Sequence, residues 1–160
     1  MNKMTTFQQQ INYKDIDKKI HRILKQTKSE VYTEGDIRKV YHHISGIDHL
    51  IISNNLCIAI NDKHLQQGFK KQINGINEFR NSVNNLSNLI NKRIIGVYLS
   101  LNNNYSVFDN FSDENFITIC NSDRNKLILD LLNFLYSNSI YIYESEEDVY
   151  MLDSEIFQKF

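Results

Sequence analysis

Residues 46–52 read GIDHLII, and residues 56–63 read LCIAINDK. Both runs are short, apolar and rich in β-branched side chains, which is typical of strands. The connection between them is polar and contains two Asn residues, which tolerate the positive φ that tight turns require. The sequence therefore predicts an antiparallel hairpin near the middle of the chain.

Helical and strand-like patterns alternate around this hairpin. Apolar residues at helical spacing predict helices over 13–26 and 66–89, and Ser122 or Asp123 caps a third helix. Apolar runs predict strands at 93–101 and 116–120 and short strands at 140–143 and 149–152. The mixed segment 30–45 fits a short strand, or a strand and a turn around Glu34-Gly35-Asp36.

This element order predicts the fold class. Hairpin strands pair antiparallel, whereas a strand that follows a crossover helix pairs in parallel. We therefore expect an α/β fold with a mixed central sheet of about four to six strands flanked by helices. The length of 160 residues suits a single domain over 1–160, with 1–12 as a flexible N-terminal tail.

Composition narrows the class of protein. A formal net charge of -1 argues against a uniformly basic coat but permits a local basic patch. Cys57 and Cys120 lie in apolar runs and indicate free thiols in a reducing compartment. Neither a signal pattern nor an apolar run of ~20 residues is present, so we expect a soluble protein of the cytoplasm or nucleus with no membrane partner. Abundant Asn, Ile and Lys indicate an A/T-rich genome, cellular or viral.

Polar side chains at the end of the predicted hairpin suggest chemistry. Side chains alternate along a strand, so Asn61 and Lys63 share one face and Asp62 points to the other. If Asp48 faces the Asn61 side, an acid, an amide and an ammonium group converge. Such oxygen donors suit Mg²⁺ or Mn²⁺, whose bound water can attack a phosphodiester with the help of a lysine.

The two runs resemble the signature of the PD-(D/E)XK superfamily, the restriction-endonuclease-like fold, in its Mrr-like and Holliday-junction-resolvase-like branches. GID at 46–48 matches the first acid, and IAINDK at 58–63 matches the apolar lead and the lysine. The order of elements agrees over roughly residues 13–120. Asn61 departs from the family, which has Glu, Asp or sometimes Gln there, so metal affinity should fall. Asp62 could compensate only if the strand end twists or the register slips by one residue.

The resemblance implies a metal-dependent DNA nuclease that hydrolyses phosphodiester bonds and commonly acts as a homodimer. Its catalytic residues would be Asp48, Asn61 and Lys63, and its ligands for Mg²⁺ or Mn²⁺ would be Asp48, Asn61 and Asp62. Accessory polar residues would come from a wider set, namely Asp17, Glu30, Glu34, Gln72 and Glu78. The residues that contact DNA would be Lys70, Lys71 and Arg80.

Other interpretations stay open. The fold could be kept with a degenerate site, in a nucleic-acid-binding or protein-assembly module, which Asn61 and the near-neutral charge favour. A small α/β domain unrelated to nucleases would require Asp48 and Lys63 to point apart. Four histidines near the hairpin lack the spacing of a zinc site with Cys57, although one of them could shuttle protons or contact phosphate; they are His42, His43, His49 and His64.

Overall fold

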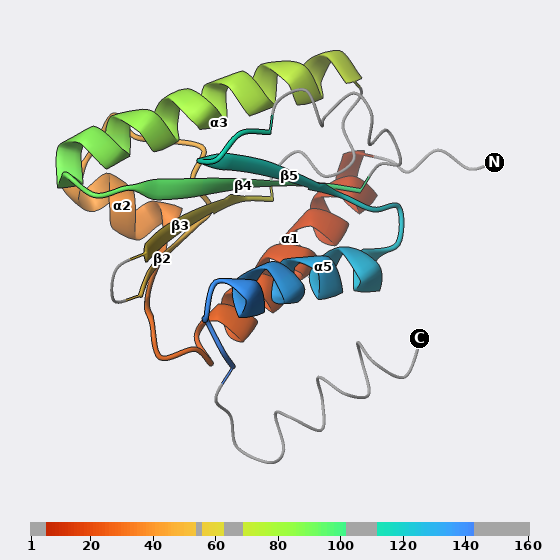
Figure 1. Cartoon of the computed structure of the whole chain (residues 1–160). Helices are drawn as coiled ribbons and strands as arrows, with labels where there is room; N and C mark the ends of the chain where they lie inside the picture. The colour runs from red at the N-terminus through yellow and green to blue at the C-terminus, as the bar shows by residue number, and fades with distance from the viewer. Residues whose placement is uncertain (1–5, 54–55, 63–68, 102–111, 143–160) are drawn as a thin grey trace.

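The computed structural model describes residues 6–53, 56–62, 69–101 and 112–142, and it has an α/β fold (Figure 1). Within these residues a mixed five-stranded sheet, in the order β1-β2-β3-β4-β5, forms the middle layer. The β1–β2 and β2–β3 pairs are antiparallel, and the β3–β4 and β4–β5 pairs are parallel. The predicted hairpin and mixed sheet are therefore confirmed. The strands are β1 (Glu30–Thr33), β2 (His49–Ser53), β3 (Leu56–Asn61), β4 (Ile94–Ser100) and β5 (Phe116–Cys120).

Four helices in the described part of the chain cover the two faces of the sheet. In Figure 1, α1 (Thr6–Leu24) and α5 (Arg124–Ser137) lie against one face, and α2 (Glu34–Val40) and α3 (Phe69–Ile90) lie against the other. Strand alternation divides the core in the same way, because Ile51 packs with the α1 and α5 side chains, whereas its neighbour Leu50 packs with those of α2 and α3. The sheet is thus buried on both faces.

The segment after β1 forms α2, so the expectation of a turn around Glu34-Gly35-Asp36 is wrong. Thr33 caps this seven-residue helix: its hydroxyl accepts the Asp36 N–H, and the Asp36 carboxylate accepts the Thr33 N–H. This reciprocal pair is a capping box, which satisfies backbone donors that the first turn leaves unpaired. The helix projects Ile37 into the core and leads to the loop before β2.

Both ends of the described chain differ in detail from expectation. Helix α1 begins at Thr6 and so includes residues 6–12, which the sequence suggested as a tail. Near the other end, Ile142 forms an isolated antiparallel bridge with Thr27 in place of the predicted strand at 140–143. The predicted strand at 149–152 lies outside the described residues. No helix in the described ranges is long and apolar enough to cross a membrane.

Gly96 of β4 packs closely against aromatic side chains. A Cβ at this position would lie 3.0 Å from Cδ2 of Phe116 and 3.3 Å from Cε2 of Phe79. We expect Gly96→Ala to lower the free energy of unfolding by about 1–3 kcal/mol, because these aromatic rings would have to move. Urea unfolding measures the change. Gly35→Ala is the matched control, since its Cβ would meet nothing closer than 3.7 Å; an equal loss in both variants would contradict the prediction.

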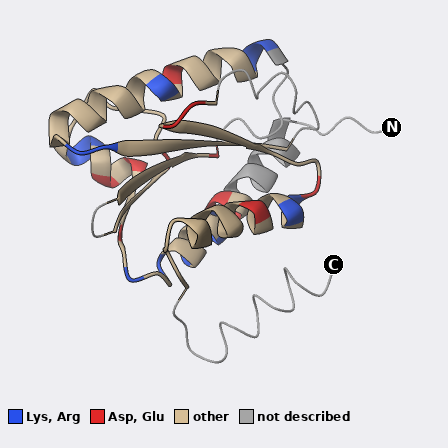
Figure 2. Cartoon of the chain, in the orientation of Figure 1, with Lys and Arg blue, Asp and Glu red and all other residues tan. Residues whose placement is uncertain are grey.

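Charged residues are distributed unevenly over this scaffold. Figure 2 shows Lys, Arg, Asp and Glu on helices and loops, with the strands almost free of them. Two acids next to the strands are nevertheless buried: Asp48, which precedes β2, is 5 % exposed, and Asp62, which follows β3, is 0 % exposed. Because buried carboxylates are costly unless they are paired, this end of the hairpin requires an explanation.

Candidate metal centre

Strand register places two pairs of polar side chains on opposite faces at this end of the hairpin. His49 lies opposite Ile60 in the β2–β3 ladder, and Ile60 packs on the α1 side of the sheet. His49 and Asp62 therefore point toward α1. Continuing the register places Asp48 opposite Asn61, on the side where Leu50 and α3 lie.

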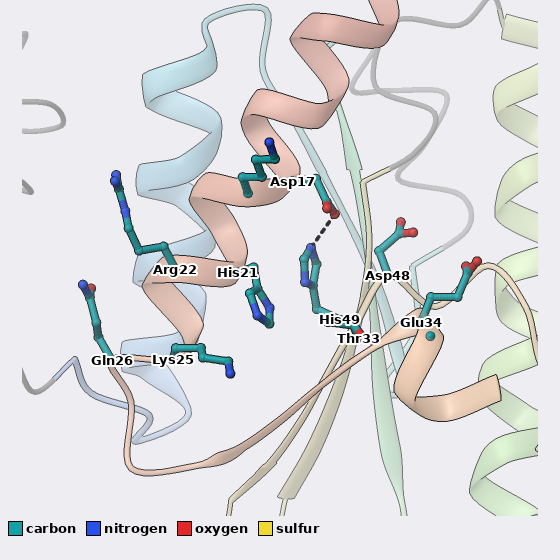
Figure 3. Close-up of a pocket in the computed structure, with 11 residues that line it drawn as sticks. Asp17, His21, Arg22, Lys25, Gln26, Thr33, Glu34, Asp48 and His49 are labelled. Carbon is teal, nitrogen blue, oxygen red and sulfur yellow. Dashed lines mark ion pairs between the residues drawn. The ribbon is translucent and has the colours of Figure 1, made fainter. Parts of the chain in front are cut away.

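Three side chains from separate elements meet on the α1 side. The Nε2 atom of His49 lies 2.8 Å from Oδ2 of Asp62 and 3.0 Å from Oδ1 of Asp17. Asp17 reaches the group from α1, whose flanking residues Ile16 and Ile20 are anchored in the core (Figure 3). The three possible ligand atoms all lie within 4.8 Å of one another. The Asp17-His49-Asp62 group could therefore hold a metal ion.

The ionisation of the group follows from its burial and its contacts. Burial alone would lower the pKa of His49, but hydrogen bonds and charges from Asp17 and Asp62 outweigh it and raise that pKa to about 9. Burial raises the pKa of Asp62 well above its ordinary value, despite the opposing effect of His49. Burial also acts on Asp17, yet its hydrogen bonds with His49 and Asp62 leave its pKa lowered. Asp17, His49 and Asp62 therefore share one proton. It is assigned to Nε2 of His49, which lies between the two carboxylates.

The group contains polar atoms that the described protein residues leave unsatisfied. Oδ1 of Asp62 and Nδ1 of His49 are buried without a hydrogen-bond partner among the described residues. Oδ1 of Asp62 has no donor within the described part of the fold. The residue is also fully buried, so bulk solvent does not reach this oxygen. A buried carboxylate oxygen in this situation is expected to bind a cation or water. The donor set therefore fits a metal ion.

Hydrogen bonds of the Asp48 and Asn61 side chains connect the segment before β2 to the end of β3, beside this group. Oδ2 of Asp48 accepts the backbone N–H of Asp62 at 2.7 Å, and Nδ2 of Asn61 donates to the carbonyl of Gly46 at 2.7 Å. Gly46 has φ +83, a backbone conformation that glycine adopts readily, and its N–H donates to the Glu34 carboxylate. These contacts fix the position of the Asp62 backbone at the end of β3.

A cleft of about 880 Å³ opens at the group and is lined by residues of α1, the start of α2 and the start of β2. Asp17, Asp48 and His49 lie at its acidic end (Figure 3). Its α1 wall carries Lys18, Arg22 and Lys25, at a spacing that places them along one side of a helix. The cleft therefore joins a potential cation site to a basic wall, an arrangement suited to a phosphate-containing ligand.

His21 also lines the cleft, one helical turn after Asp17. Its ring stacks on that of His49, with centroids 6.0 Å apart and an interplanar angle of 24°. Burial lowers the pKa of His21, and the neighbouring His49 adds to this effect. His21 was not among the site residues that the sequence predicted, although its i, i+4 spacing from Asp17 is a usable signal. For His49 the sequence suggested only zinc binding, proton transfer or phosphate contact.

The other predicted site residues lie elsewhere. Gln72 of α3 is fully buried on the opposite side of the sheet, where it accepts from the Tyr98 hydroxyl at 2.6 Å and donates to Ser100 at 3.1 Å. Glu30 accepts a hydrogen bond from Tyr32 on β1. Lys63 and His64 lie outside the described residues. The exposed or partly exposed α3 residues do not line the cleft; they are Lys70, Lys71, Glu78 and Arg80, of which Arg80 pairs with Asp113.

Comparison with known proteins gives no relative. No protein-family model matches the chain, and no match is found among curated proteins or solved structures. The fold and the geometry of the site are therefore the basis for a functional proposal.

Proposed function

We propose that this protein is a metal-dependent nuclease that hydrolyses phosphodiester bonds in DNA and binds its metal ion through Asp17, His49 and Asp62. One observation carries the proposal: these three donors converge beside a cleft that Asp17 and His49 line and whose α1 wall is basic. A phosphodiester is the ligand that needs both features, because its anionic oxygens interact with cationic side chains and with a divalent ion.

Each part of the cleft has a role in this reaction. A bound divalent ion would supply Lewis-acid activation of water and of the scissile phosphate. Lys18 and Lys25 would bind backbone phosphates and align the strand with the acidic end of the cleft. Asp48 would keep Asp62 in place through the 2.7 Å hydrogen bond from the Asp62 N–H. Lys63, next in the chain, stays the predicted lysine of the site.

The proposed assignment to the PD-(D/E)XK superfamily has topological support. Apart from β1 and α2, which lie between α1 and the hairpin, the order is a helix, an antiparallel hairpin, a second long helix and a strand parallel to β3, as the resemblance implies. One acid, Asp48, precedes the first hairpin strand, β2, and another acid, Asp17, comes from the first helix, α1. In this assignment Asp62 takes the place of Asn61 as the ligand, because Asp62 faces Asp17 and His49.

The test is cleavage of labelled single-stranded, double-stranded and branched DNA with Mg²⁺ or Mn²⁺. We expect Asp17→Asn to lower the cleavage rate at least about 100-fold, because the amide keeps the size of the side chain but removes a charged ligand. The Asp17 side chain is 34 % exposed, so the fold should tolerate the change.

Asp15→Asn is the matched control for this experiment. Asp15 lies on the same helix, is exposed, and pairs with Arg124 instead of the candidate ligands. The Asp15→Asn protein should cleave DNA at the rate of the unmodified protein. Metal-dependent cleavage that survives Asp17→Asn, or that falls equally in both variants, would contradict the assigned site.

A second candidate function is a binding module with the nuclease fold but no hydrolysis. The observation that favours it is the pairing of His49 with both carboxylates, which neutralises part of the cluster within the protein itself. In that case Asp17, His49 and Asp62 would be a structural ion-pair network. Folded protein that binds DNA but cleaves none of the three substrates with either ion would support this function.

A further inference from the structure

We infer that the Asp17-His49-Asp62 group selects a divalent transition-metal ion, such as Mn²⁺ or Co²⁺, over Mg²⁺. The inference rests on the proposed metal site, and it specifies the class of ion that the proposed nuclease uses. It follows from the donor atoms, which are two carboxylate oxygens and one imidazole nitrogen.

The imidazole nitrogen is the deciding donor. Mg²⁺ strongly prefers oxygen ligands and keeps several bound waters, whereas imidazole is a good ligand for first-row transition metals. His49 Nε2 occupies the centre of the group, within 3.0 Å of one oxygen of each carboxylate. An ion bound by both acids would therefore meet the ring nitrogen as well.

The rigidity of the site prevents the protein from avoiding this contact. His49 is 1 % exposed at the start of β2, and Asp62 is fixed by its backbone hydrogen bond to Asp48. The ring also stacks on that of His21. For a Mg²⁺ ion to be surrounded by oxygen alone, a buried ring would have to leave the site.

A further buried atom points to a ligand at this position. Oδ1 of Asp62 has no hydrogen-bond partner among the described residues, and the side chain is completely buried. Asp62 therefore offers an additional oxygen beside the one that contacts His49. Three protein ligands leave coordination positions that water would fill on a bound transition-metal ion, and two of the three residues, Asp17 and His49, line the cleft.

The first measurement is metal binding by the full chain after treatment with a chelator. Titration calorimetry should show that Mn²⁺ and Co²⁺ bind at least about 100-fold more tightly than Mg²⁺. Pulsed electron paramagnetic resonance of the Mn²⁺ complex should show a directly bound imidazole nitrogen, and labelling histidine with ¹⁵N should change that signal. Equal affinities for Mn²⁺ and Mg²⁺, or a Mn²⁺ complex without a nitrogen signal, would overturn the inference.

Variants assign the nitrogen to His49. We expect His49→Asn to weaken Co²⁺ binding by at least about 10-fold and to remove the nitrogen signal, since an amide oxygen replaces the ring. His43→Asn removes an exposed imidazole and should leave both measurements unchanged. If His49→Asn does not fold, Asp17→Asn serves instead: its partly exposed site should tolerate the change, and it should lose the tight Mn²⁺ binding. A nitrogen signal and tight binding that persist in Asp17→Asn would overturn the inference.

The same measurements separate this inference from the proposed nuclease function. Tight Mn²⁺ binding with a His49 nitrogen signal, but no DNA cleavage, would support the metal assignment and contradict the nuclease. DNA cleavage that depends on Mg²⁺, with no nitrogen signal from Mn²⁺, would support the nuclease and contradict the metal assignment.

Discussion

Asp62→Asn is expected to destabilise the metal-free protein by about 3 kcal/mol at pH 7.5, because breaking one side of a buried ion pair leaves the other charge uncompensated. The affected charge is the His49 ring, which is 1 % exposed and lies 2.8 Å from Oδ2 of Asp62. After the substitution its remaining anionic partner is Asp17, whose side chain is 34 % exposed. Solvent weakens that second pairing, so Asp17 cannot replace Asp62.

Urea unfolding in the presence of a chelator measures this loss without interference from bound metal. Asp130→Asn is a suitable control, because Asp130 is an exposed acid of α5 and its substitution should change stability by less than about 0.5 kcal/mol. A loss from Asp62→Asn below about 1 kcal/mol would show that the His49–Asp62 pair is not an important buried interaction.

The double variant His49→Gln/Asp62→Asn tests the cause of the loss. It replaces both charged groups with amides, so no uncompensated charge is left in the interior. We expect the double variant to be more stable than the sum of the two single losses predicts, with an interaction energy of at least about 1 kcal/mol. Additive losses would mean that packing, and not charge, explains the effect of Asp62→Asn.

Much of the fold was predictable because its signals are local. The apolar runs around Ile51 and Ile58 have strand character by themselves, and regular apolar spacing marks α3 before any contact is known. Asp123 also caps α5 as its sequence context suggested. Helix α2 was overlooked because it is short and contains Gly35. The available signal was the capping box formed by Thr33 and Asp36.

The candidate metal group depends on contacts that the sequence does not record. The predicted neighbours Asp48 and Asn61 do lie opposite each other when the strand register is continued. However, Asp17 approaches from a helix that packs on the other face, where His49 and Asp62 point. Strand alternation indicates that Asp48 and His49 face opposite sides, but it cannot indicate which side α1 covers. That choice depends on tertiary packing.

The second large effect concerns pH. The metal-free protein is expected to lose roughly 3 kcal/mol of stability between pH 6.5 and 9, because the pKa of His49 is raised from 6.5 to about 9 in the folded state. Below pH 6.5 both the folded and the unfolded protein bind the His49 proton, and the stabilisation from His49 is fully present. This stabilisation is lost as the pH rises from 6.5 through 9, where the folded protein releases the proton. The raised pKa of Asp62 has the same sign, but it reflects the same shared proton of the group and adds no separate loss of stability.

The other ionisable groups that face His49 act at lower pH. The lowered pKa of Asp17 gives stability that is lost only as the pH falls below about 4. The lowered pKa of His21 gives stability that is lost as the pH falls through 6.5 and below. Asp48 lies beside the cluster, and its charge contributes to the raised pKa of Asp62. Stability should therefore be greatest near pH 6–7.

Urea unfolding at half-unit steps from pH 5 to 9.5, with a chelator present, gives this profile directly. Asp17→Asn removes one of the two carboxylates that raise the pKa of His49, so its alkaline loss of stability should still begin near pH 6.5 but should be smaller and end at a lower pH. Asp15→Asn, on the same helix but away from His49, should keep the original profile. If stability is constant or rises between pH 6.5 and 9, the shared proton of the Asp17-His49-Asp62 group cannot be a source of folding free energy. Such a profile would mean that His49 is neutral in the folded protein at pH 7.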